Sequence, residues 1–110
     1  VGARNGEAPR RLAVAYGDVR KFVDGSCPRL RIGRATDNDL VVPEARVSRH
    51  HAEIVLRGAQ FQLVDRSVNG CWLQQADGDA VPVHRAEVAL IGTGLLWFPD
   101  PSGAQLRYGC

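Results

Sequence analysis

Two arginines and a serine in the first half of the chain have the chemistry of an anion receptor. Arg34 follows Gly33 at the end of the apolar run 30–33, and Ser48 and Arg49 come from a later polar stretch. An arginine presents five N–H donors in a planar fork that can grip a phosphate bidentately, and a serine hydroxyl supplies a further donor. A phosphate monoester carries about −1.5 to −2 charge near pH 7 and three acceptor oxygens. If these residues converge in space, they predict a phosphate-binding site.

The same stretch also raises the alternative that the protein is an enzyme. Ser48 lies three residues before His51, as a nucleophile might lie near its general base. However, the sequence has no Gly-x-Ser-x-Gly elbow, no obvious acid to orient the histidine and no recognisable oxyanion device. It also has no glycine-rich loop of the Walker or dinucleotide type. The residues therefore favour a protein that is not an enzyme and needs no cofactor.

Two short clusters raise the alternative of a metal site. His50 and His51 are adjacent, so on a strand their side chains point to opposite faces and cannot bind one ion without distortion. The run Asp37-Asn38-Asp39 suggests calcium, but the later ligands and the central glycine of an EF-hand loop are missing. Asn and Asp side chains often bond nearby backbone amides and hold a loop in shape. We therefore expect no metal and a structural role for the acidic run.

Composition restricts what surrounds these residues. The 110 residues are 45% hydrophobic and 24% charged, which suits one domain with a core. Residues 1–10 are polar and rich in Gly and Pro, so we expect a tail or linker there and the folded domain over 11–110. A net charge of +2 and a few scattered aromatic residues argue against nucleic acid as a partner. The sequence contains no long apolar run, which argues against a membrane partner.

The cysteines and the first residue indicate the setting of the chain. Cys27, Cys71 and Cys110 form neither an even disulfide set nor a C-x-x-C zinc pattern. We therefore expect reduced thiols and a cytoplasmic location. The chain begins at Val1 and not at Met. We expect it to be a piece of a longer protein.

Turn residues recur along the chain and divide it into short β-strands. No ten-residue stretch shows helical spacing free of turn formers, so the chain is predicted to be all-β. Tight turns are expected at Gly17-Asp18, 57–59 and Asp77-Gly78, and Asn69-Gly70 alone indicates a hairpin turn with positive φ. The spacing favours a two-sheet sandwich and leaves a barrel as the alternative. The expected strands cover residues 12–16, 18–23, 30–34, 40–42, 51–56, 61–64, 71–74, 80–83, 87–91, 95–98 and 105–108.

The sequence contains four motifs in the order in which they occur in the forkhead-associated (FHA) domain, and it therefore resembles that family. The resemblance implies a β-sandwich of about 10–11 short, mostly antiparallel strands with its functional loops at one end. It also implies a bacterial signalling module whose partner is a phosphothreonine-containing protein or peptide. The motifs are Gly33-Arg34, Asp37-Asn38-Asp39-Leu40, Ser48-Arg49-His50-His51-Ala52-Glu53-Ile54 and Asp65-Arg66-Ser67-Val68-Asn69-Gly70.

The resemblance also implies roles for single residues. The matching asparagine bonds the backbone of the bound peptide, and the matching histidine braces the loops instead of touching phosphate. The residues implied to contact the phosphopeptide are Arg34, Ser48, Arg49, Val68 and Asn69, and those implied to support the site are Gly33, His51, Asp65 and Gly70.

The sequence departs from the family pattern in three places. Val68 stands where a Thr or Ser commonly offers a hydroxyl to the phosphate, and Cys71 stands where Thr is usual. Residues 77–98 lack a second Asn-Gly hairpin and resemble the FHA domains attached to bacterial class III nucleotide cyclases. Val68 leaves a second function open, that of a scaffold or dimerisation module that binds partners without phosphate.

Overall fold

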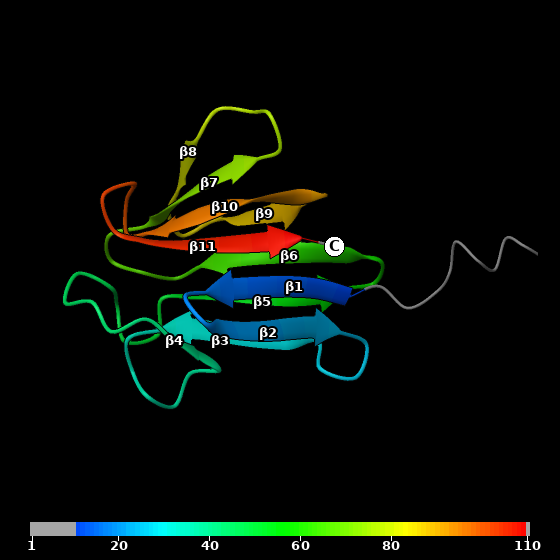
Figure 1. Ribbon diagram of the computed structural model, residues 1–110, viewed down its shortest axis with the longest axis horizontal. Helices are drawn as coiled ribbons and strands as arrows, with labels where there is room; N and C mark the ends of the chain where they lie inside the picture. Colours follow the sequence, from blue (N-terminus) through cyan, green and yellow to red (C-terminus); the bar gives the residue numbers. More distant parts are fainter. Residues whose placement is uncertain (1–10, 110) are drawn as a thin grey trace, which may run out of the picture.

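The computed structural model describes residues 11–109, which form eleven β-strands (Figure 1). The tail expected over residues 1–10 lies outside the described residues. The strands are β1 (Arg11–Tyr16), β2 (Val19–Asp24), β3 (Arg29–Gly33), β4 (Leu40–Val41), β5 (Ala52–Arg57), β6 (Gln60–Asp65), β7 (Cys71–Gln75), β8 (Val81–Val83), β9 (Glu87–Leu90), β10 (Thr93–Phe98) and β11 (Ala104–Gly109).

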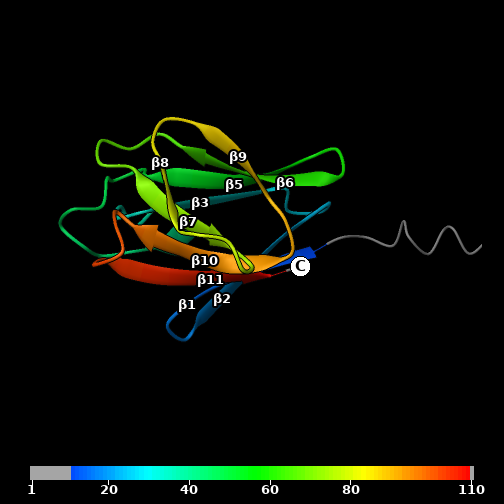
Figure 2. The same cartoon turned by 90° about the horizontal axis from the view of Figure 1, so that it is seen from above.

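The strands build two sheets that lie as separate layers when the molecule is seen from above (Figure 2). The six-stranded sheet has the order β2-β1-β11-β10-β7-β8, and the five-stranded sheet has the order β4-β3-β5-β6-β9. All pairs are antiparallel except β3 with β4. The predicted all-β sandwich is confirmed, and the barrel alternative is excluded. Residues 11–109 contain no helix long and apolar enough to cross a membrane.

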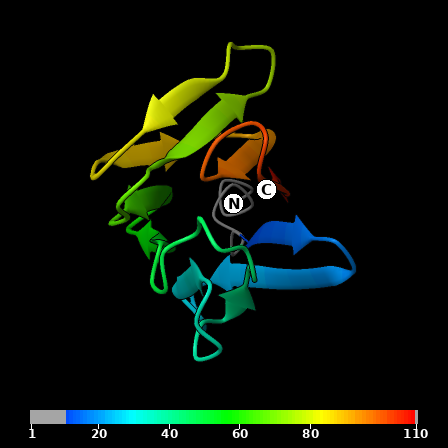
Figure 3. The same ribbon diagram turned by 90° about the vertical axis from the view of Figure 1, so that its left-hand side faces the viewer.

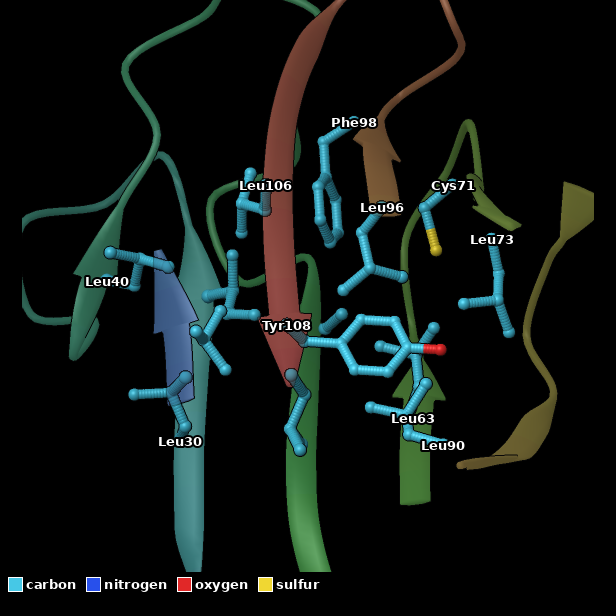
Figure 4. Close-up of a cluster of buried hydrophobic side chains, with 14 of the residues drawn as sticks. Leu30, Leu40, Leu63, Cys71, Leu73, Leu90, Leu96, Phe98, Leu106 and Tyr108 are labelled. Atoms are coloured by element: carbon cyan, nitrogen blue, oxygen red, sulfur yellow. The ribbon is translucent and has the colours of Figure 1, made fainter. Parts of the chain in front are cut away.

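Apolar side chains that alternate along the strands fill the space between the sheets. On β5, Ala52 and Ile54 are buried, while Glu53 between them is partly exposed. Figure 4 shows the core, where Leu63 of one sheet and Leu96 and Phe98 of the other are fully buried. Burying one such side chain stabilises the fold by about 1.5–3 kcal/mol. The core therefore fixes the strand ends from which the loops depart.

Two of the predicted tight turns are confirmed. Gly17 and Asp18 join β1 to β2, whose ladder ends at the pair of Tyr16 with Val19. In the same way, a two-residue turn that begins with Gly58 joins β5 to β6. Gly17 and Gly58 have φ values of 59° and 63°, a conformation that glycine adopts without steric cost.

The turn at Asp77-Gly78 is part of a longer connection than predicted. The Gly78 N–H donates to the Gln75 carbonyl at 2.7 Å, so the chain does turn here. The ladder of β7 with β8, however, already ends at the pair of Leu73 with Val81.

The hairpin interpretation of Asn69-Gly70 is wrong. Strand β6, before it, lies in the five-stranded sheet, and β7, after it, lies in the six-stranded sheet. Gly70 still has the expected positive φ, at 81°. This segment therefore carries the chain from one sheet to the other.

The three loops that carry the motifs lie at one end of the sandwich, the end that Figure 3 faces. They are the β3–β4 loop (34–39), the β4–β5 loop (42–51) and the β6–β7 loop (66–70). The Arg34 N–H donates to the Ser48 carbonyl at 3.0 Å and so joins the first two loops. The Arg66 N–H donates to the His51 carbonyl, also at 3.0 Å, and joins the third loop to the second.

Candidate functional site

Arg34 is held in place by the loop that faces it. Its Nε donates to the Val47 carbonyl oxygen at 3.0 Å. Within residues 11–109, the two terminal Nη nitrogens have no hydrogen-bond partner, and the side chain is exposed. Arg34 therefore presents both Nη groups to solvent from an anchored position, as bidentate binding of an anion requires.

Ser48 connects the second loop to the third. Its Oγ accepts a hydrogen bond from the Val68 N–H at 3.2 Å. Because the oxygen is the acceptor in this bond, the hydroxyl hydrogen stays available to a ligand. The Val68 amide is engaged in the same bond, so it is not free to replace the hydroxyl that this position lacks.

Arg49, Val68 and Asn69 have exposed side chains on the same loops. The Arg49 guanidinium forms no ion pair within residues 11–109. The Asn69 Nδ2 donates to the Arg46 carbonyl at 3.0 Å, which leaves its Oδ1 to accept from a ligand. The structure thus places all five predicted contact residues on the three adjoining loops.

Asp65 and Ser67 shape the β6–β7 loop from inside. Asp65 is 2% exposed, and its Oδ1 accepts from the Ser67 N–H at 3.0 Å and from the Ser67 hydroxyl at 2.9 Å. The Ser67 Oγ in turn accepts from the Gly70 N–H at 2.7 Å. These hydrogen bonds satisfy the buried carboxylate and fix the conformation of the loop.

His51 is fully buried and braces two loops at once. Its Nδ1 accepts from the Ser48 N–H at 3.0 Å, so Nε2 carries the proton and donates to the Gly70 carbonyl at 2.7 Å. The ring packs edge-on against Phe98, with centroids 5.0 Å apart. Burial lowers the pKa of His51, against the opposing effects of the Gly70 carbonyl and Asp65. The folded protein therefore favours the neutral imidazole.

Cys71 interacts with Asp65, whose Oδ2 lies 3.6 Å from His51 Nε2, and these three residue types occur together in catalytic sites. Cys71 is 1% exposed, however, and His51 is not exposed at all. Burial first, and then the nearby Asp65 carboxylate, raise the pKa of the Cys71 thiol far above its ordinary value. A catalytic cysteine needs a lowered pKa and access for substrate, so this cluster has the opposite properties.

Arg85 and His84 were not identified from the sequence, although both hold the β6–β7 loop. The Arg85 Nε and the His84 Nε2 both contact the Ser67 carbonyl, at 3.1 and 3.2 Å. The Arg85 N–H donates to Asp65 Oδ1 at 3.0 Å, and Arg85 has a φ of 52°. A non-glycine residue at positive φ is uncommon, and no sequence signal marked this one.

The acidic run has a structural role, but its hydrogen bonds differ from the prediction. Asp39 does accept a backbone N–H, that of Arg31, at 2.8 Å. Asn38 instead donates, through Nδ2, to the carbonyls of Ala35 and Arg49, each at 2.8 Å. In the described part of the chain, no group of His, Cys, Asp and Glu side chains is arranged to hold a metal ion.

Gly33 leaves no room for a side chain, and Gly33→Ala is expected to lower the free energy of unfolding by about 1–3 kcal/mol. An added Cβ would collide with the Arg49 carbonyl oxygen and lie 2.9 Å from Asn38 Nδ2. Urea unfolding measures the loss, with Gly25→Ala as the matched control because a Cβ at Gly25 meets nothing within 4 Å. Equal stability of the two variants would contradict this account of the β3 end.

Comparison with known proteins places these loops in a family. Residues 30–90 match the family model described as FHA domain. The chain is 38% identical over 109 residues to the ABC transporter ATP-binding/permease protein Rv1747 of Mycobacterium tuberculosis, a match that covers 94% of this chain and 13% of Rv1747. It is 35% identical to the glycogen accumulation regulator GarA of Mycolicibacterium smegmatis, over 71% of this chain and 53% of GarA. The chain thus spans about half or less of the length of these relatives.

Solved structures show the same fold. The crystal structure of M. tuberculosis Rv1747 FHA-1 superposes with a TM-score of 0.73 at 21% identity, covering 93% of this chain and 97% of that one. M. tuberculosis EmbR, in complex with a low affinity phosphopeptide, gives a TM-score of 0.67 at 27% identity, covering 90% of this chain and 24% of EmbR. The matched residues 30–90 are more than half of the chain and include all three loops, so this chain belongs to the FHA domain family.

Proposed function

We propose that this domain is a phosphothreonine-dependent protein-binding module of a signalling protein. The observation that carries the proposal is the anchored Arg34, which lies on the same joined loops as Ser48 and Arg49. Among residues 11–109, the Arg34 Nη groups and the Arg49 guanidinium have no partner. Two cations and a hydroxyl are the donors that a phosphate dianion requires. EmbR, a structural neighbour, was solved with a phosphopeptide, which supports the same class of ligand here.

Each predicted residue has a role in this proposal. Arg34, Ser48 and Arg49 bind the phosphate, and the Asn69 Oδ1 accepts an N–H of the bound peptide. Val68 lies beside them and supplies only an apolar contact. The residues that hold these groups in place are Gly33, His51, Asp65 and Gly70.

The direct test is titration with a degenerate phosphothreonine peptide library and with the same library unphosphorylated, followed by calorimetry. We expect measurable binding of the phosphorylated library alone. Equal binding of both libraries would favour a phosphate-independent scaffold or dimerisation module, the second candidate. The observation that favours this candidate is Val68, whose 69% exposed side chain can neither donate nor accept a hydrogen bond.

Val68→Thr is expected to tighten phosphothreonine peptide binding by about fivefold, or about 1 kcal/mol. Threonine has nearly the shape of valine and adds a donor where the Val68 amide is already engaged by Ser48. Calorimetry with a phosphopeptide and its unphosphorylated twin measures the change, and only the phosphopeptide should gain. An unchanged affinity for the phosphopeptide would mean that the phosphate does not reach position 68.

The wider context of the domain stays a prediction. A nucleotide cyclase as the parent protein rests only on the pattern of residues 77–98, whereas the sequence relatives are a transporter and regulators. A cytoplasmic location rests on the expectation of reduced thiols. The boundary between the tail and the domain at residue 11 stays a prediction as well.

A further inference from the structure

The outer face of the six-stranded sheet carries two tryptophans side by side. Trp97 of β10 and Trp72 of β7 are register partners, and Trp72 also lies opposite Pro82 of β8. Both tryptophans alternate with buried residues, so they point away from the other sheet (Figure 2), and both are partly exposed. Leu95, two residues before Trp97, points the same way. We call these four residues the tryptophan patch.

Two exposed arginines lie on one side of the tryptophan patch. Leu95 is opposite Arg107 of β11, and Ala15 of β1 is opposite both Arg107 and Arg20 of β2, so all of them share the outer face. Within residues 11–109, neither Arg20 nor Arg107 forms an ion pair.

The charges of these two arginines are not balanced on this face. In the strands of the six-stranded sheet, the one carboxylate at an outward position is that of Asp24, and it lies 3.8 Å from the Arg11 Nε. Arg11 is itself at an outward position, opposite Asp24 in the ladder of β1 with β2. The outer face therefore keeps the positive charge of Arg20 and Arg107.

A pocket of about 420 Å³ joins the apolar and the charged parts of this face. Leu95 of the tryptophan patch lines it together with Thr93, Gln74 and Arg107. The pocket lies at the small end of the range of about 300–1,000 Å³ that is usual for ligand sites, so it suits one or two side chains of a partner. An apolar side chain in this pocket would lie beside the Arg107 guanidinium.

The charge and the shape of the face determine which occupant fits it. Partly exposed tryptophans and arginines are the residues that most often carry binding energy at protein interfaces. A second copy of this domain would place the same two cations, Arg20 and Arg107, against each other, and like charges disfavour that contact. In layered proteins, helices commonly cover the face of a sheet. Strand β10 has six residues and is about 20 Å long, the length of about 13–14 helical residues.

We propose that the outer face of the six-stranded sheet binds an amphipathic helix of a partner protein that is acidic along one flank. The helix lies along β10, and its apolar stripe rests on the tryptophan patch. Its acidic flank lies over β11, where a carboxylate pairs with Arg107. Arg20 is roughly 10 Å farther out, because β2 lies two strand spacings of about 4.8 Å from β11, so it contributes less. The inference does not rest on the phosphothreonine function.

A phage-displayed library of helical peptides tests the proposal. Leucines are fixed at i, i+3, i+4 and i+7 spacing to give one apolar stripe, and the positions on both flanks vary among Glu, Gln and Lys. Selection on the immobilised domain should enrich Glu on one flank only. A synthetic peptide of the enriched sequence should bind in calorimetry about three- to tenfold more tightly than its Glu→Gln twin. A selection that enriches no helix, or enriches helices without Glu, would overturn the inference.

Variants of the domain show where the selected peptide binds. Trp97→Thr should weaken both the Glu and the Gln peptide by about tenfold or more. In Arg20→Gln/Arg107→Gln, the difference between the two peptides should disappear. The matched control is Arg29→Gln/Arg57→Gln, which removes the same charge from the five-stranded sheet and should keep the difference. Urea unfolding verifies that each variant is folded.

Reversal of one charge provides a test of opposite sign. Arg107→Glu should bind a peptide with Lys in place of the flank Glu more tightly than it binds the Glu peptide. The parent should show the reverse order. If Arg107→Glu still preferred the Glu peptide, the flank would not lie over β11, and the inference would be wrong.

Further outcomes separate this surface from the phosphothreonine site and from self-association. Arg34→Ala should keep its affinity for the helical peptide within about twofold of the parent, because Arg34 lies outside the face. Selected peptides that bind Trp97→Thr as tightly as the parent lie elsewhere and overturn the inference. Sedimentation should show a monomeric parent. A dimer that Trp97→Thr dissociates would assign the face to a second copy and would also overturn it.

Discussion

Arg34→Ala is expected to weaken phosphothreonine peptide binding by roughly ten- to a hundred-fold, because charge-assisted hydrogen bonds contribute about 1.5–3 kcal/mol. The side chain is exposed and its Nε bonds only the Val47 carbonyl, so the fold should survive. Calorimetry at fixed salt measures the affinity. Arg34→Lys should recover little, since an ammonium cannot keep the Nε anchor and also offer two coplanar donors.

The matched control for Arg34 is Arg57→Ala, which also removes an exposed guanidinium. Its binding should stay within about twofold of the parent because it lies outside the three loops. If the Arg34 variant bound like this control, the phosphate would have to be held elsewhere, and the assignment of the site would be wrong.

His51→Ala is expected to lower the free energy of unfolding by about 3 kcal/mol, measured in urea. The substitution leaves a cavity beside Phe98 and removes the partners of the Ser48 N–H and the Gly70 carbonyl. Peptide affinity should fall only as far as the loops lose order. His50→Ala, at an exposed position, should cost about 0.5 kcal/mol or less. Equal losses in the two variants would mean that His51 does not brace the loops.

Acid should destabilise the parent through the same residue. The pKa of His51 is lowered in the folded protein. Below pH ~6.5, the His51 imidazole therefore binds a proton more readily in the unfolded chain than in the folded one. The contribution of His51 to the free energy of unfolding is therefore fully present above pH ~6.5 and is lost progressively as the pH falls below that value. Asp24, Asp37 and Asp100 have lowered pKa values, each mainly through a side-chain hydrogen bond, and act in a lower window, below pH ~4. Urea unfolding at pH 7 and 5.5 should show a slope in the parent that His51→Gln loses.

The strands could be predicted because the signals that define them are local. Glycines in tight turns and the alternation of Ala52, Glu53 and Ile54 are visible in any short window of sequence. All eleven expected strands occur, with boundaries shifted by one or two residues. The same locality explains the error at Asn69-Gly70, because a turn dipeptide does not reveal whether the flanking strands share a sheet.

The contacts that hold the site could not be predicted because they depend on long-range register. Arg85 takes a left-handed conformation while its N–H bonds Asp65, a residue far from it in sequence. Glu53 pairs with Arg29 and Arg66 only because β3 and β6 lie on either side of β5. Neither the conformation of Arg85 nor the pairing of Glu53 can be predicted from the local sequence.

Two asparagine side chains anchor the binding loops by donating to main-chain carbonyl oxygens. Asn69 bonds the carbonyl of residue 46, and Asn38 bonds that of residue 49. Every amino acid has this carbonyl, so Arg46 and Arg49 can mutate without releasing either loop. A substitution at Arg49 would change the contact with the phosphate, and one at Arg46 would lose the bonds of its guanidinium to Asp100 and Ser102, but both loops would keep their asparagine anchors. Duplicated copies of such a domain can therefore diverge in ligand preference by single substitutions while these two loop anchors persist.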